Sequence, residues 1–280
     1  MVLLIIIGET YMKIDNSIKS ILLENAQNNR RRCGSRFINE EEKEYILDYL
    51  KNEKDIKPLE SFNKDKAELS KLFQQTLEEA NDKQSVLDAL EVKTNNHDDP
   101  AMLALGLIYM FGRCVEKDYK KGIDYIVRAA INENPIAQRY LAKCHYNGSF
   151  GSFSTSKEDD EFEQAIGHNI QSRELAYFWD FKSAMNGYPD AQYIFVENHL
   201  YRSYDIGGFS DELFELLEIS ANQGHSQARE MLIGILLNEK SGYQNFNKAT
   251  KLAQQYSLED QRLAITLRNM FKKRGLNLQF

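Results

Sequence analysis

Small residues recur at a fixed spacing along the second half of the chain. The clearest markers are five alanines, Ala101, Ala137, Ala191, Ala228 and Ala264, which are separated by 36, 54, 37 and 36 residues. The longest step equals one such unit with about eighteen extra residues. The pattern therefore predicts four tandem copies of one structural unit.

Within one copy, apolar positions follow the period of a helix. In the first copy, Ala101, Leu105 and Tyr109 lie at four-residue intervals, which places them on one helix face, and Gly112 ends that helix. A second amphipathic stretch follows and stops before Pro135, because the residue before a proline disfavours helical backbone. Each helical hairpin buries only one face against its neighbour, so we expect the copies to stack in a row.

The first copy carries the motif of a known repeat. Residues 101–138, AMLALGLIYMFGRCVEKDYKKGIDYIVRAAINENPIAQ, resemble the Sel1-like repeat: Ala-x3-Leu-Gly-x2-Tyr, Gly, Asp-Tyr-x-Lys, Ala-Ala, then Ala. The resemblance covers roughly residues 101–263 and implies an all-α, right-handed α/α superhelical solenoid of tetratricopeptide-like helix-turn-helix repeats. Its first helices would line a concave face. The copies also depart from the motif: Gly122 stands where the family usually has alanine, and Phe195-Val196 replaces Leu-Gly in copy three.

The repeats divide the chain into four regions. These are 1–64, a helical region with a short apolar start; 65–100, a helix pair that is a degenerate leading repeat; 101–263, the four Sel1-like repeats; and 264–280, a C-terminal capping helix. The extra residues of copy two form an insertion at about 149–171. It is polar and acidic, with serines around Gly148 and Gly151, which predicts a loop. This loop is either part of the binding face or a solvated excursion without a role.

Charge and the N-terminus limit the classes of partner. A formal net charge of -7 argues against general nucleic-acid binding, which needs a cationic surface. Residues 1–7 form an apolar run that is too short to cross a membrane. They are a short strand, an anchoring tail or the remnant of an export signal, and membrane contact follows only from the last two. The default expectation is a cytoplasmic protein, with a periplasmic or envelope-associated one as the alternative.

Metal and catalytic chemistry lacks its usual spacing in this sequence. The histidines include no His-x3-His pair, and His145 and His199 share the register of Tyr109, which favours a packing role. The chain has three cysteines and no Cys-x-x-Cys pair, no Gly-rich phosphate loop and no Gly-x-Ser-x-Gly elbow. We therefore expect no metal, no cofactor and no catalytic residue. Some bacterial Sel1-like proteins carry disulfides between helices, so the resemblance leaves a Cys114–Cys144 bridge open beside buried thiols.

Tetratricopeptide grooves give a rule for the binding positions. By analogy, the concave face takes the position before each anchor alanine and those two, six and nine residues after it. The resulting candidates are Arg139, Lys143 and Tyr146 in copy two, Asp190, Tyr193, Glu197 and Leu200 in copy three, and Gln227 and Glu230 in copy four. Copy one supplies Leu103, Leu107 and Met110, an apolar set that is either part of the groove or buried under the N-terminal helices.

These features favour an interaction protein over an enzyme. The resemblance implies a bacterial, non-catalytic adaptor or scaffold that binds a protein or peptide on its concave face. One alternative is an immunity protein that neutralises a partner toxin. A second is a β-lactam-binding or β-lactam-hydrolysing protein, which would need regular disulfide-paired repeats that this chain lacks.

Overall fold

The described part of the protein is all helical. The computed structural model describes residues 83–113, 115–149, 156–166, 171–200, 211–276 and 278, and within them it contains eleven helices and no strand. They are α4 (Lys83–Asn95), α5 (Asp99–Phe111), α6 (Tyr119–Ile131), α7 (Pro135–Asn147), α8 (Ser156–Ile166), α9 (Arg173–Met185), α10 (Pro189–Leu200), α11 (Asp211–Asn222), α12 (Ser226–Leu236), α13 (Phe246–Glu259) and α14 (Gln261–Lys272). The expected region 1–64 and the whole first helix of the pair, expected at 65–80, lie outside the described residues.

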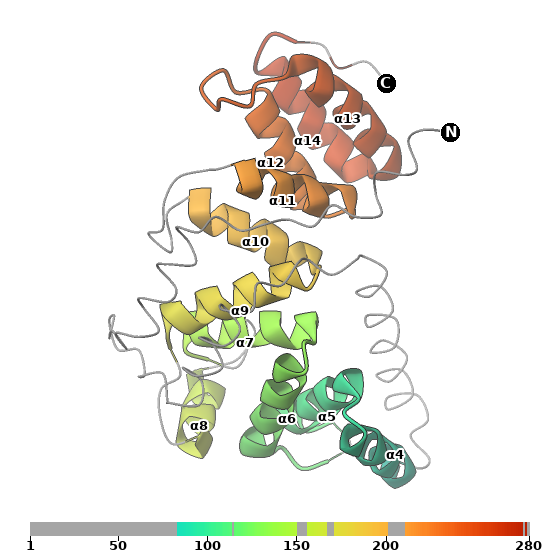
Figure 1. Ribbon diagram of the computed structural model, residues 1–280, viewed down its shortest axis with the longest axis vertical. Coiled ribbons are helices and arrows are strands. Elements are labelled where there is room, and N and C mark those ends of the chain that lie inside the picture. The colour runs from blue at the N-terminus through green and yellow to red at the C-terminus, as the bar shows by residue number, and fades with distance from the viewer. Residues whose placement is uncertain are drawn as a thin grey trace.

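The helices form a solenoid of hairpins. The first and second helices of the four copies are α5 and α6, α7 and α9, α10 and α11, and α12 and α13, and α14 begins a further unit. Each helix packs on the next one along the stack, and α12 also contacts α14. The stack runs along the long axis of the molecule, from α4 at one end to α13 and α14 at the other (Figure 1). The expected all-α solenoid is confirmed.

The first helices begin at side chains that occupy one repeat position. Asp98, Asn134 and His225 each accept a hydrogen bond from the backbone N–H of the anchor alanine three residues later, at 2.9, 2.9 and 3.2 Å. Asp260 caps α14 in the same way through the N–H of Leu263. Such caps satisfy backbone donors that the first turn of a helix leaves without a partner. The repeat position thus marks the start of the first helix in copies one, two and four.

A second periodic contact ties neighbouring copies together. The residue after the anchor alanine is Gln138 in copy two, Gln192 in copy three and Arg229 in copy four. Each side chain donates to the carbonyl oxygen eight residues earlier, in the second helix of the preceding copy, at 2.9, 3.2 and 2.9 Å. A buried side chain bonded to a buried carbonyl fixes the register between copies, because losing the bond would leave polar groups without partners.

The departure from the repeat motif at Gly122 has a packing reason. A Cβ atom at this position would lie 2.6 Å from Met110 Cγ and 2.9 Å from the carbonyl oxygen of Gly106. A Cβ atom at Gly106 would lie 2.9 Å from the carbonyl oxygen of Gly122. The two glycines let α5 and α6 approach closely, and the side chain of Met110 occupies the space that an alanine at 122 would need.

The prediction of a loop across the insertion is wrong for residues 156–166, which form α8. Phe162 anchors this helix, because its side chain is 0 % exposed and lies edge-on to Tyr119 of α6, with ring centroids 5.7 Å apart. A few apolar residues in a mostly polar, acidic segment are a weak periodic signal, and the contact of Phe162 with Tyr119 is about forty residues away in sequence. Residues 150–155 and 167–170 of the insertion lie outside the described part.

Both ends of the described stack agree with the expected helices. The stretch expected to be helical just before the first repeat corresponds to α4. The C-terminal helix also forms, although α14 begins at Gln261 rather than at residue 264. Of the helices described, none is both long enough and apolar enough to span a lipid bilayer.

Candidate binding groove

A groove lies between the first helices of the last copies. It has a volume of about 470 Å³ and is bounded by α10, α12 and α14. The residues that line it are Tyr193, Glu197, Leu200, Gln227, Glu230, Met231, Gly234, Ile235, Asn238 and Met270. We call this surface the groove. Apolar side chains from the three helices meet in it beside the carboxylates of Glu197 and Glu230.

The repeat register explains which side chains reach the groove. Tyr193 and Glu230 lie two residues after their anchor alanines, and Glu197, Gly234 and Met270 lie six residues after theirs. Residues four apart on a helix share one face, so each first helix presents the same two positions. At the position six residues after the anchor alanine, copy two has a lysine and copy three a glutamate, whereas copy four has a glycine.

Gly234 leaves room in the groove that packing does not require. A Cβ atom at this position would have only one near neighbour outside its own helix, Met270 Cε at 3.5 Å, which is an ordinary van der Waals contact. Glycine inside a helix costs about 1 kcal/mol relative to alanine. This glycine therefore differs from Gly106 and Gly122, which close backbone packing demands. It lowers helix stability and opens the groove.

The fold brings together the candidate groove residues of copies three and four, except Asp190, which does not line the groove. Tyr193, Glu197 and Glu230 all line the groove, with Leu200 and Gln227 beside them. The Tyr193 hydroxyl donates to the Glu197 carboxylate, four residues along the same helix. Whether these residues contact a partner stays a prediction.

The candidates of copy two do not line the groove. The expectation that Arg139 is an accessible groove residue is wrong, because it is 8 % exposed and bonded inside the stack. Lys143 is half-exposed, with Nζ 3.9 Å from Asp190 Oδ2, and Tyr146 is exposed on α7. In copy one, Leu103 and Met110 are fully buried, which agrees with the alternative of burial for these two.

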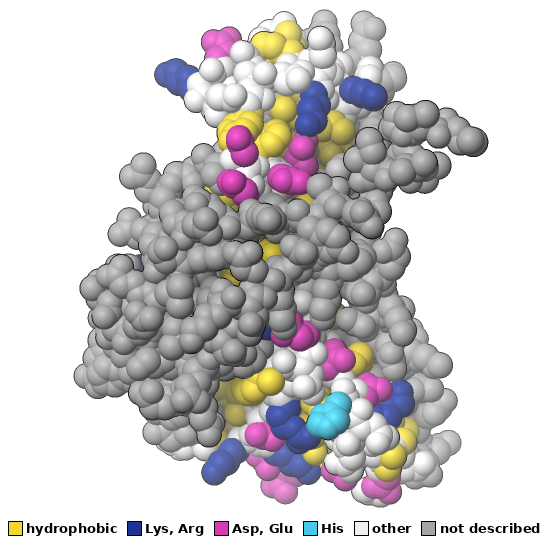
Figure 2. All heavy atoms as spheres, in the orientation of Figure 1, with side chains coloured by type: hydrophobic (Ala, Val, Ile, Leu, Met, Phe, Trp, Pro, Cys, Tyr) yellow, Lys and Arg dark blue, Asp and Glu magenta, His cyan; other side chains and the backbone are white. Residues whose placement is uncertain are grey.

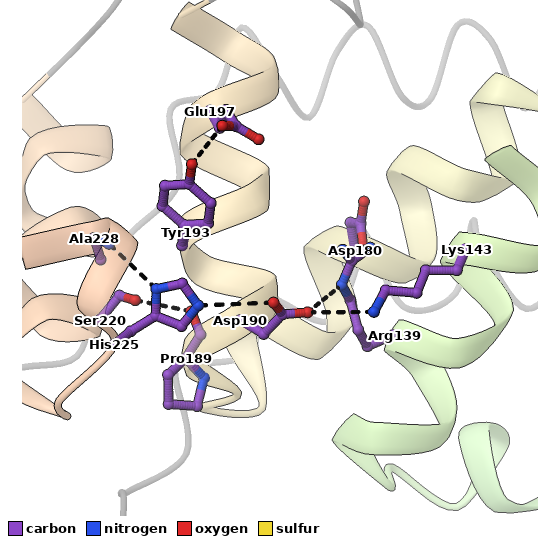
Figure 3. A network of polar contacts seen from close by, with 10 residues as sticks. All are labelled: Arg139, Lys143, Asp180, Pro189, Asp190, Tyr193, Glu197, Ser220, His225 and Ala228. Carbon is purple, nitrogen blue, oxygen red and sulfur yellow. Dashed lines mark hydrogen bonds and ion pairs between the residues drawn. The ribbon is translucent and has the colours of Figure 1, made fainter. Parts of the chain in front are cut away.

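A buried polar network lies behind the groove (Figure 3). Arg139 donates from Nη1 to Asp180 Oδ1 at 2.8 Å and from Nε to Asp190 Oδ2 at 2.7 Å. Asp180 is itself buried, so its charge depends on the guanidinium. The network joins three helices of two copies, since Arg139 comes from α7, Asp180 from α9 and Asp190 from the first turn of α10.

The network continues through His225 to the groove wall. His225 Nδ1 accepts from the Ala228 N–H, which leaves the proton of the neutral ring on Nε2, 3.7 Å from Asp190 Oδ1. Partial burial alone would raise the pKa of Asp190, but the nearby His225 ring and the Arg139 charge together hold it well below its usual range. His225 also stacks on Tyr193, with ring centroids 4.9 Å apart. Contacts from three copies thus hold the Tyr193 ring in place. The Tyr193 hydroxyl in turn positions the Glu197 carboxylate.

Sequence reasoning missed much of the apolar side of the groove. Met231, Gly234, Ile235 and Met270 were not expected to line a surface. Two signals in the sequence point to them. Gly234 is an isolated glycine within an amphipathic helix, and Met270 lies six residues after Ala264, which continues the repeat register beyond the fourth copy.

The reactive side chains near the stack axis serve packing. Burial raises the pKa of the Cys144 thiol, which keeps it protonated and a poor nucleophile, while Cys114 lies outside the described residues. His199 Nδ1 donates to the Phe195 carbonyl at 2.7 Å, so Nε2 accepts from the Tyr177 hydroxyl at 3.2 Å. His145 is buried as well. Within the described ranges, no cluster of three or more histidine, cysteine or acidic residues could hold a metal ion.

Comparisons with known proteins agree with the repeat. The Sel1 repeat family model matches residues 99–134 and 135–160. A solved Sel1 repeat protein from Oxalobacter formigenes is 22% identical over 52% of this chain and 96% of its own, with a TM-score of 0.42. A protective antigen of uropathogenic Escherichia coli that displays an SLR fold is 15% identical over 93% of this chain and 58% of its own, with a TM-score of 0.39. A search of curated proteins gives no significant match.

Proposed function

Because this chain contains Sel1 repeats, we propose that it is a non-catalytic interaction module that binds a partner protein or peptide in the groove on its concave face. Sel1 repeats form helical stacks of the kind that mediate protein–protein interaction. In such stacks the packing residues recur from copy to copy, whereas the residues that recognise a partner differ between copies. The groove lies at positions where copies three and four differ from the first.

The groove is the observation that carries this proposal. Its apolar side chains offer area for an anchor side chain, and its polar rim can fix the orientation of the anchor. A segment of a partner can lie along it because three first helices contribute side by side. The opening at Gly234 supports the proposal further, since binding explains a glycine that stability disfavours.

The chemistry of the buried side chains supports a non-catalytic role. Cys144 is held protonated by burial, and His199 uses both ring nitrogens in contacts within the stack. Arg139 forms ion pairs with both Asp180 and Asp190 within the stack. Each of these groups therefore already has a structural task.

A capture experiment with two variants of one residue tests the proposal. The full chain, Gly234→Ala and Gly234→Leu serve as baits in a lysate of the source organism. Alanine adds one methyl group at ordinary contact distance, whereas leucine fills the groove. We expect a partner that is retained by the first two baits and lost on Gly234→Leu. Equal recovery of every protein by all three baits would contradict binding in the groove.

A further inference from the structure

The groove selects a particular charge. Resting on the proposed function, we infer that the groove binds a cationic peptide segment, in which an aliphatic side chain enters the space over Gly234 and lysine or arginine side chains meet Glu197 and Glu230. The inference adds the chemical class of the partner to its place of binding. It follows from three features of the groove.

The first feature is a pair of carboxylates that have no basic neighbour among the described residues. Glu197 and Glu230 stand on helices α10 and α12, and the described residues of the groove lining include no lysine, arginine or histidine. Among the described residues, no basic side chain forms an ion pair with either of them, and Glu197 accepts only from the neutral Tyr193 hydroxyl. Some acids elsewhere are paired, as Asp180 is with Arg139 and Glu133 with Lys182.

The net charge of the whole chain has the same sign as the two carboxylates. The whole chain carries a formal net charge of -7. On the face shown in Figure 2, acidic side chains gather beside apolar ones in the region of α11 and α12. A cationic segment is attracted by such a field, whereas an acidic peptide or a nucleic acid is repelled.

The second feature is the apolar floor. Leu200, Met231, Ile235 and Met270 surround the space above Gly234. Methionine side chains adapt to ligands of different shape, and a missing Cβ deepens the floor by the width of a methyl group. This floor suits one aliphatic side chain of the partner, flanked by the two carboxylates.

The third feature is the fixed position of Glu197. Its carboxylate is held by Tyr193, which is stacked on His225 and is therefore supported by the network of Figure 3. A charged group that is already oriented loses little conformational entropy when a cation binds. The buried network thereby has a use in binding, although its own charges do not reach the partner.

Synthetic peptides test the inference on the full chain. The probes are three fluorescent peptides with the same leucine positions, in which the flanking residues are lysine, glutamine or glutamate. Binding is followed by fluorescence anisotropy with the unchanged protein and with Glu230→Gln, Gly234→Leu and Gly234→Ala. Glu163→Gln, at an exposed position of α8, is the matched control for the loss of one charge.

We expect the lysine peptide to bind most tightly and to weaken as salt is added. Glu230→Gln should weaken it by roughly two- to fivefold, the effect of losing one exposed charge pair. Gly234→Leu should abolish its binding and Gly234→Ala should weaken it less, because alanine fills only part of the space, while Glu163→Gln should leave it unchanged. Circular dichroism of every variant checks that the helices are intact.

Other outcomes separate the two proposals. If the glutamine or glutamate peptide binds as tightly and is still blocked by Gly234→Leu, the groove binds peptides but the inferred cationic partner is wrong. If no peptide binds, the inferred partner class is again wrong. The capture experiment then tests separately whether any partner binds in the groove. If the lysine peptide binds equally to Gly234→Leu, it binds elsewhere, and the inference fails.

Discussion

Two glycines within helices of this protein have opposite surroundings, and the same substitution separates them. Gly122→Ala would place a Cβ against Met110 and the backbone of Gly106, whereas Gly234→Ala meets only the end of the flexible Met270 side chain. We expect the first to destabilise the protein by about 1–3 kcal/mol through overpacking. The second should stabilise it by about 0.5–1 kcal/mol through helix propensity.

Chemical denaturation of the two variants measures both effects. The alanine that is common in this repeat family would thus destabilise this chain at position 122. Equal stabilisation by both substitutions would contradict the close approach of α5 and α6.

Arg139 is important for stability rather than for contact with a partner. Its charge satisfies the buried Asp180 carboxylate and also bonds Asp190. Arg139→Met should therefore lower the free energy of unfolding by about 3–5 kcal/mol, because it leaves a buried carboxylate without its partner. Lys143→Met is the matched control, since Lys143 is 45% exposed, and it should cost less than about 1 kcal/mol. A similar cost for both variants would show that the buried pair has no special weight.

His199 makes the stability depend on pH. Burial lowers the pKa of its imidazole, although the hydrogen bond to Phe195 opposes this effect. In the unfolded chain a histidine takes up its proton near pH 6.5, at a higher pH than the folded His199. The unfolded state therefore binds more protons as the pH falls below about 6.5, and the free energy of unfolding decreases until the folded imidazole is also charged.

We expect His199→Gln to remove this contribution. Denaturation midpoints of the unchanged protein should fall between about pH 7 and pH 5, and the fall should be smaller in the variant. An identical fall in both proteins would mean that other groups cause the acid sensitivity.

At the scale of single elements, Phe162 is the one buried side chain among those described in α8. It packs against α6, and most of the other described side chains of α8 are exposed. Phe162→Ala should release the helix locally, because regions with few buried contacts open without unfolding the whole molecule. Hydrogen exchange of residues 156–166 should become faster, while exchange in α11 to α13 stays unchanged. Asp160→Ala, at an exposed position, is the control. Faster exchange throughout the stack would show that α8 is part of the core.

The periodic signals predicted the elements of the repeats well. Anchor alanines, Pro135 and Gly112 act within one or two turns of helix, so the sequence alone locates the helix ends near them. The same reasoning failed for α8, because its order depends on the distant contact between Phe162 and Tyr119. Helix caps such as His225 were also missed, since histidine is an uncommon residue at that position.

At the scale of the whole molecule, the register rule located the groove but not the state of each side chain. It correctly placed Tyr193, Glu197 and Glu230 on one surface. The rule could not predict that Arg139 bonds to Asp180, because that pairing depends on the distance between α7 and α9. Burial of long charged side chains is set by the partners that the fold brings near, and the repeat pattern carries no information about them.

The proposed binding surface is the groove bounded by α10, α12 and α14. The most direct test is hydrogen–deuterium exchange of the full chain with and without its captured partner, or with the lysine peptide. We expect slower exchange on binding in α12 and α14 and at the end of α10. The same protection should appear in Gly234→Ala and be absent in Gly234→Leu. Protection confined to the second helices α6, α9, α11 and α13, and unaffected by Gly234→Leu, would contradict binding in the groove.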